Sequence, residues 1–281
     1  MKSNAKQVFI NILRQSGLLQ IAEKFRFVWR LAADWRANRR FIKNNLGFPV
    51  PPSYLAYDAY GHINWQSYFQ TGKSHTEYIC KIIREHSDKT SLTIGEWGCG
   101  PARVIRHFPA ELDERTNNYF GFDCNSKSIG WCNQNIDGIS FHVNPLAPPL
   151  PCESDSFDCI YCLSVFTHLS EELHYAWAEE LTRVVKPGGL ILISTQGDAF
   201  RHLLLNEERL KFDQGQLVIR GKIKEGMRCF NAFHPNSFVR QKMFDSCNIL
   251  AHYPGPDSGP IIQDVWLISN GCLGWFESSL D

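Results

Sequence analysis

The stretch LTIGEWGCGPAR, residues 92–103, has the composition of a ligand-binding turn. An apolar segment ends at Glu96 and Trp97, and glycines follow at positions 98 and 100. Glycine tolerates positive φ and, without a Cβ, lets a ligand lie against bare backbone. We expect a helix to begin directly after the turn, with its unpaired N–H groups aimed at the same place. Open α/β sheets bind nucleotide-like molecules with such strand–turn–helix units.

Polar residues end the next three apolar stretches. NYFGFDCN brings Asp123 to the end of its stretch, ISFHV is followed by Asn144, and FDCIYCL ends in Leu163 and is followed by Ser164. A carboxylate about 20 residues beyond a glycine turn can accept hydrogen bonds from both hydroxyls of a ribose. These residues are therefore expected to meet the glycine turn at one edge of a sheet.

The elements that position them alternate along the chain. Strands are expected near residues 92–97, 119–122, 139–143, 157–163 and 189–195, with helical segments between them, which implies right-handed crossovers and a mostly parallel sheet. A helix is expected over about 76–87. NILAHY and IIQDVWLIS supply two last strands, and HPNSFVRQKMFDS a helix before them. Residues 205–234 alternate apolar and polar residues around glycines, which suggests one or two inserted hairpins.

EWGCGPAR, GFDCN, SFDCIYCLSVFTHL and ELTRVVKPGGLILIST resemble successive motifs of class I S-adenosylmethionine-dependent methyltransferases, among them bacterial enzymes associated with small-molecule and polysaccharide synthesis. The resemblance implies an α/β, Rossmann-like, seven-stranded sheet with helices on both faces. The last strand would be antiparallel and inserted between the fifth and sixth. A nicotinamide-binding fingerprint needs a third glycine where Arg103 stands, which argues against a dehydrogenase. We expect Arg103 to anchor the turn rather than to touch substrate.

The same resemblance implies a site for S-adenosylmethionine. Glu96 would meet the ammonium group of the donor and Asp123 its ribose, while Asn144 stands where the family usually has an acidic residue near the adenine. The expected donor-binding residues are Glu96, Gly98, Cys99, Gly100, Asp123, Asn144, Leu163 and Ser164.

Two histidines are candidates for a general base that takes a proton from a hydroxyl acceptor. His168 follows the fourth strand and His234 ends the insertion. Both stay open at this stage. No His, Cys or Asp cluster has metal-ligand spacing, so no metal is expected. Cys159 and Cys162 have CxxC spacing, but on a strand they point to opposite faces and are expected in the core.

The charge of the chain is balanced overall, with 29 basic and 29 acidic residues, but it is unevenly distributed. Residues 1–45 contain ten Lys or Arg and two acidic residues, with apolar residues at helical spacing. Two interpretations remain: a helical cap packed on the catalytic domain, or a basic amphipathic helix on an anionic membrane. We divide the chain into residues 1–75, a helical extension with an aromatic-rich connector, and residues 76–281, the methyltransferase domain with its insertion at 205–234.

The sequence restricts the acceptor and the location only broadly. A small-molecule or sugar acceptor, methylated at oxygen, is the favoured function. Nucleic acid is disfavoured because LSVF replaces the Asn/Asp-Pro-Pro-aromatic motif and the chain beyond residue 45 is net acidic. A non-catalytic partner protein is the other alternative, against which the intact glycine turn argues. No run of 18 apolar residues and no export signal is present, so a cytoplasmic protein is expected, with peripheral contact to the inner face of the membrane left open.

Overall fold

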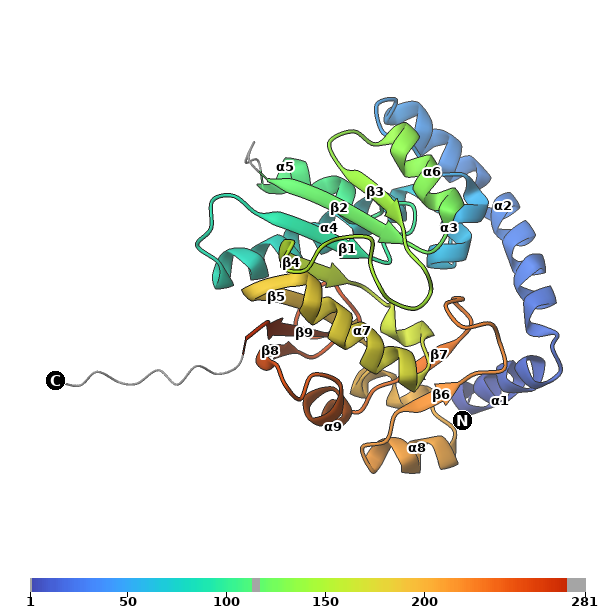
Figure 1. The fold of residues 1–281 in the computed structure, drawn as a ribbon. Coiled ribbons are helices and arrows are strands. Elements are labelled where there is room, and N and C mark those ends of the chain that lie inside the picture. Colours follow the sequence, from blue (N-terminus) through green and yellow to red (C-terminus); the bar gives the residue numbers. More distant parts are fainter. Residues whose placement is uncertain (1, 113–116, 272–281) are drawn as a thin grey trace.

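A computed structural model describes residues 2–112 and 117–271 (Figure 1). Its helices and strands follow the alternation expected from the sequence. The α-helices are α1 Lys2–Gln15, α2 Leu19–Asn44, α3 Ser53–Tyr60, α4 Trp65–His86, α5 Phe108–Leu112, α6 Ser126–Asn135, α7 Glu171–Val184, α8 Asn206–Asp213 and α9 Asn236–Phe238. The strands are β1 Thr93–Trp97, β2 Asn118–Asp123, β3 Ser140–Val143, β4 Phe157–Cys162, β5 Val185–Thr195, β6 Val218–Arg220, β7 Asn231–Phe233, β8 Asn248–Tyr253 and β9 Asp264–Ser269.

Seven strands form one sheet in the order β3-β2-β1-β4-β5-β9-β8. β1 to β5 pair in parallel, whereas β9 is antiparallel to both β5 and β8. The predicted Rossmann-like sheet is thus confirmed, including the last strand between the fifth and the sixth. Because β1, β2, β3 and β4 run the same way, their carboxyl ends meet at one edge.

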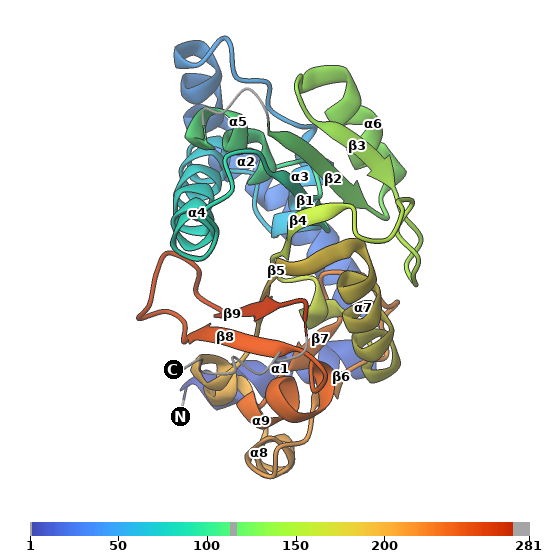
Figure 2. The same cartoon turned by 60° about the vertical axis from the view of Figure 1, so that its left-hand side comes forward.

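Two apolar layers cover the two faces of the sheet. Helices α4, α5 and α6 pack on one face and α7 and α9 on the other, which confirms helices on both faces. Figure 2 shows α4 and α7 on opposite sides of the strands. Cys159 belongs to the first layer and Cys162 to the second, as the two-residue period of a strand requires.

The N-terminal extension consists of two helices rather than one, because the chain turns at Ser16 to Leu18 with Gly17 at φ 72°. α1 lies against the insertion that carries α8, β6 and β7 (Figure 1). The expected boundary between residues 75 and 76 falls inside α4, which begins at Trp65. Asn64 caps that helix by accepting from the Ser67 N–H at 2.9 Å, so the helix starts earlier than the apolar period suggested.

Three local expectations differ from the structure. After the glycine turn the chain makes turns and a 3-10 segment, Ile105–His107, before the five-residue α5, instead of one regular helix. The insertion holds one hairpin, β6 with β7, as expected, but the helix α8, which was not expected, precedes it. Beyond His234, α9 continues into a π-helical segment, Val239–Met243.

Candidate functional site

A cavity of about 990 Å³ opens at the carboxyl ends of β1, β2 and β4. All eight residues expected to hold the donor line it: Glu96, Gly98, Cys99, Gly100, Asp123, Asn144, Leu163 and Ser164. The parallel topology explains this convergence, since residues that end neighbouring parallel strands share one edge.

The glycine turn adopts positive φ angles, which glycine tolerates without strain. Gly98 has φ 76° and Gly100 φ 52°. A Cβ on Gly98 would lie 2.2 Å from Cγ2 of Val165, so a side chain has no room there. The N–H groups of Gly98 and Cys99 both donate to the carbonyl of Phe122, at 2.7 and 3.0 Å, which ties the turn to the end of β2. The turn therefore offers a fixed backbone surface to the cavity.

The Asp123 carboxylate is held by two backbone amides. Oδ2 accepts from the Gly100 N–H at 2.7 Å and Oδ1 from the Asn125 N–H at 2.7 Å. Burial raises the pKa of Asp123 and repulsion by Asp58 adds to the rise, while the two amides lower it. Each carboxylate oxygen has a second lone pair, so both remain able to accept from a pair of ligand hydroxyls.

Glu96 is buried at the end of β1, with 4% of its surface exposed. Its Oε2 accepts from the Ile105 N–H and the Tyr161 hydroxyl, both at 3.0 Å. Burial raises the pKa of Glu96 to about 8, against the lowering effect of these two donors. A cation placed beside Glu96 would reverse this shift, because opposite charge favours the ionised form.

Asn144 has an unsatisfied acceptor at the cavity. Its side-chain N–H donates to the Pro145 carbonyl at 2.6 Å, but the buried Oδ1 has no hydrogen-bond partner among the described residues. A buried polar atom without a partner costs free energy, so this oxygen fits an amino group of a ligand. Ser164, at φ 63°, donates through Oγ to Oε1 of Gln263 at 2.8 Å.

His168 lines the cavity, and its ring is oriented by the insertion. Nδ1 lies 2.7 Å from the carbonyl oxygen of Phe230. A carbonyl only accepts, so Nδ1 carries the proton and Nε2 carries the lone pair. Burial lowers the pKa of His168 and Arg228 lowers it further, which keeps the ring neutral near pH 7. A neutral, oriented imidazole has the properties of a proton acceptor.

The structure does not bring His234 to this cavity. It is fully buried, and its Nε2 lies 2.7 Å from Nε2 of His174, which is also fully buried. Burial drives the pKa of His234 well below its usual value, and His174 lowers it further. His234 therefore pairs with His174 behind the cavity wall, among Phe166 and Phe238.

The sequence did not predict the parts of the cavity wall that come from outside the sheet. α3 and the residues after it contribute Asp58, Tyr60 and His62, and the insertion contributes Glu225 and Arg228. The Tyr60 hydroxyl lies 3.4 Å from the Cys99 carbonyl and accepts from the Arg103 N–H at 3.3 Å, so α3 covers the glycine turn. The aromatic residues near position 60 were the available signal, but packing in the core explained them equally well.

Arg103 lies at the base of the cavity and is held by neighbours. Its guanidinium lies 4.6 Å from the centre of the Tyr60 ring and donates to Thr71 Oγ1 at 3.1 Å. These contacts join the glycine turn to α3 and α4. Among the described residues, no group of three or more His, Cys, Asp or Glu side chains is placed to hold a metal ion.

The fold places two buried or partly buried carboxylates, Glu96 and Asp123, and the neutral imidazole of His168 around one cavity at the carboxyl ends of the parallel strands. Residues 94–189 match the family model of a methyltransferase domain. Residues 94–189 are therefore similar to a methyltransferase domain, the sheet has the class I fold with β9 antiparallel to β5, and S-adenosylmethionine is the cofactor.

Solved structures show the same fold at low identity. The PH0226 protein of Pyrococcus horikoshii is 16% identical with a TM-score of 0.52, covering 79% of this chain and 100% of its own. A chain from the complex of the Haloferax volcanii Trm112 methyltransferase activator with a putative methyltransferase is 14% identical with a TM-score of 0.50, and the coverage is the same, 79% and 100%. A putative sarcosine dimethylglycine methyltransferase of Galdieria sulphuraria is 14% identical with a TM-score of 0.50, covering 70% of this chain and 85% of its own.

Proposed function

We propose that this protein transfers the methyl group of S-adenosylmethionine to an oxygen atom of a small-molecule or sugar acceptor, with His168 as the general base. The donor half of the cavity would be formed by the eight residues around the glycine turn. The acceptor half would be formed by His168, Gln263 and the walls from α3 and the insertion, with Leu163 and Ser164 of the donor half facing it.

The donor supplies an activated methyl group on a sulfonium, so the chain's own residues mainly position and deprotonate. Asp123 and Asn144 would hold the ribose and the adenine, and Glu96 the ammonium group. His168 Nε2 would accept the proton of the acceptor hydroxyl as the oxygen–carbon bond forms and the bond between the methyl carbon and the sulfonium sulfur breaks, which leaves a neutral thioether. The Phe230 carbonyl, bonded to Nδ1–H, would then stabilise the imidazolium.

The observation that carries this proposal is the hydrogen bond from His168 Nδ1 to the Phe230 carbonyl inside the cavity wall. It fixes the tautomer that a base needs.

The test separates binding from turnover. His168→Ala is expected to leave the dissociation constant for S-adenosylmethionine unchanged in calorimetry and to lower turnover by about 10²- to 10⁴-fold. The control is His202→Ala, which removes an exposed histidine outside the cavity. The acceptor for this assay comes from a panel of hydroxylated small molecules and sugars, scored by mass spectrometry for a gained methyl group. Full turnover in His168→Ala would contradict the role as base.

Location and membrane contact are proposals of the same kind. Within the described ranges, no helix combines the length and apolar character needed to cross a bilayer. We place the protein in the cytoplasm, with residues 1–45 in peripheral contact with the inner face of the membrane. The support is the excess of basic over acidic residues in this segment.

A further inference from the structure

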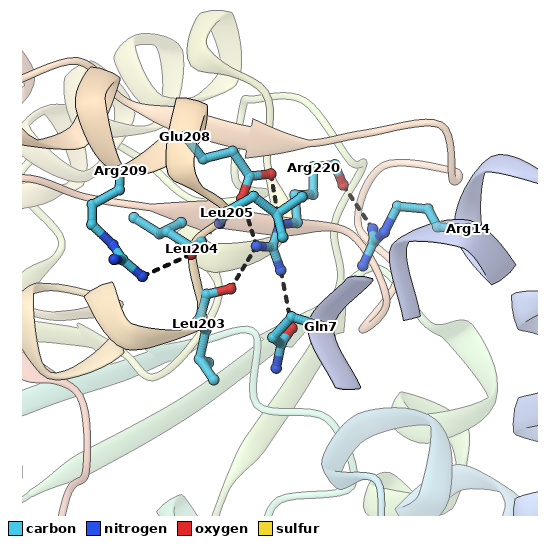
Figure 3. A network of polar contacts seen from close by, with 8 residues as sticks. All are labelled: Gln7, Arg14, Leu203, Leu204, Leu205, Glu208, Arg209 and Arg220. Atoms are coloured by element: carbon cyan, nitrogen blue, oxygen red, sulfur yellow. Dashed lines mark hydrogen bonds and ion pairs between the residues drawn. The ribbon is translucent and has the colours of Figure 1, made fainter. Parts of the chain in front are cut away.

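The two N-terminal helices are attached to the rest of the molecule by polar contacts. The buried Arg14 guanidinium donates to the carbonyls of Arg220 and Cys229, at 2.8 and 2.6 Å. Arg220 donates in turn to Gln7 on α1 at 3.3 Å and to Glu208 on α8 (Figure 3). These contacts fix which side of α1 faces the domain.

The longer helix α2 is fixed in the same way at both ends. Near its start, Glu23 forms an ion pair with Arg228 and accepts from the Tyr57 hydroxyl at 2.9 Å. Near its end, the buried Asn38 donates to the Ile63 carbonyl at 2.7 Å and accepts from the Trp65 N–H at 3.0 Å. The inner side of α2 is thus held by hydrogen bonds and one ion pair, together with the buried Phe41, which packs on Ala56, Trp65 and Tyr68.

The opposite side of both helices is apolar and exposed, the reverse of an ordinary amphipathic cap. We name this surface the outward face. Its residues, with their exposed fractions, are Val8 (45%), Phe9 (60%), Ile12 (57%), Ile21 (51%), Phe25 (74%), Val28 (62%), Trp29 (61%) and Trp35 (56%). On α2 they recur at helical spacing, so they form one stripe rather than scattered residues. A contiguous exposed apolar patch marks an interaction site.

The charges around the outward face have one sign. Arg36, Arg39 and Lys43 continue along the same side of α2 and are exposed. The two acidic residues of this segment face elsewhere: Glu23 pairs with Arg228, and Asp34 lies near Arg30 and Asn64. Among the described residues of α1 and α2, the outward face therefore carries cations and no carboxylate.

We propose that the outward face binds the surface of an anionic lipid bilayer, with α1 and α2 lying in the plane of the headgroups. Apolar side chains on such a helix enter the boundary of the acyl chains, tryptophans favour the interface, and Lys and Arg pair with anionic lipids. A second copy of this chain fits less well, because pairing two outward faces would bring arginines together without acids to neutralise them. This inference rests on the membrane contact proposed above and assigns its surface. Figure 1 shows α2 at the rim of the molecule, outside the layers that cover the sheet.

The helix that would lie on the membrane also reaches the cavity. Glu23 of α2 holds Arg228, which lines the cavity and stacks 5.1 Å from the centre of the Tyr57 ring. The ion pair between Glu23 and Arg228 therefore connects the helix proposed to contact lipid with the wall of the proposed acceptor half.

The test is sedimentation of the full chain with phosphatidylcholine vesicles, alone or mixed with phosphatidylglycerol, at low salt. We expect binding to the mixed vesicles and at least about tenfold weaker binding to the neutral ones. The double variant Phe25→Ser/Trp29→Ser should bind the mixed vesicles at least about tenfold more weakly. Arg36→Glu/Arg39→Glu should abolish the preference for phosphatidylglycerol. The matched control, Leu210→Ser/Ile262→Ser, removes residues of similar exposure, 63% and 64%, outside α1 and α2.

Calorimetry with S-adenosylmethionine shows whether each variant is folded and keeps this result separate from methyl transfer. If the protein binds the donor but neither kind of vesicle, the proposal that the outward face binds a membrane is wrong, and the enzymatic proposal is unaffected. Equal vesicle binding by parent and Phe25→Ser/Trp29→Ser overturns the membrane proposal too. So does a dimer in light scattering that this variant dissociates, because the outward face would then join two copies.

Discussion

Replacing Glu96 by glutamine should stabilise the protein while weakening its hold on the donor. Glu96 is buried at the end of β1, and burial raises its pKa from 4.5 to about 8. In the unfolded chain the same carboxyl is ionised at about pH 7, so folding must take up a proton there. Each pKa unit corresponds to about 1.4 kcal/mol. At pH 7 the raised pKa of Glu96 therefore lowers the free energy of unfolding by about 3 kcal/mol.

The sign follows from the raised pKa. The stability of the parent is fully present below pH 4.5 and falls as the pH rises through about 8. Glutamine has the same shape and no charge, and its carbonyl can still accept from the Ile105 N–H. Glu96→Gln should therefore gain about 3 kcal/mol at about pH 7 and less than about 1 kcal/mol at about pH 5.

Urea unfolding of the donor-free protein at the two pH values measures the gain. Glu153→Gln, at an exposed glutamate, serves as the control. In calorimetry, Glu96→Gln should bind S-adenosylmethionine about 10- to 100-fold more weakly, since a charged hydrogen bond is worth about 1.5–3 kcal/mol. An equal gain at both pH values, or a loss at about pH 7, would refute the argument from burial.

Two further variants test the donor half of the cavity. Asp123→Ala should weaken the binding of S-adenosylmethionine by about 1–3 kcal/mol in calorimetry, because hydrogen bonds to a carboxylate are lost. Unchanged affinity would show that Asp123 does not hold the ribose. Gly98→Ala should destabilise the protein by about 1–3 kcal/mol in urea, since its Cβ meets Val165 at 2.2 Å and φ is 76°. Gly138→Ala has the same φ with open space around its Cβ, so it measures the strain alone, and equal losses in the two variants would disprove the clash.

The convergence of the eight expected residues on one cavity was predictable because most of them lie at strand ends. Glu96, Asp123 and Asn144 each follow an apolar stretch, and parallel pairing brings such ends to one edge. The residues of the proposed acceptor half do not all lie at the ends of parallel strands. Gln263 lies just before β9, and Arg228 lies in the insertion between β6 and β7. Neither follows a strand of the parallel set, so no pattern in the sequence pointed to them.

The two histidines show the same limit. The sequence left both His168 and His234 as candidates for the general base, with His168 the first of the two. Packing separated them, because His168 faces the cavity with Nδ1 on Phe230, whereas His234 is buried against His174. Which of two titratable groups meets a cavity depends on contacts between distant segments.

By itself, the sequence determined the alternation of strands and helices, the glycine turn and the acids that follow it, because these depend on short-range periodicity and backbone freedom. The tertiary structure alone decided which side of the N-terminal helices is buried. Their apolar period predicted a stripe. In the structure Arg14 and Asn38 donate to carbonyls of distant segments and Phe41 packs in a buried cluster, and the stripe lies on the opposite, exposed side. A helical period defines a face, and only the partners available in space determine whether that face packs inward.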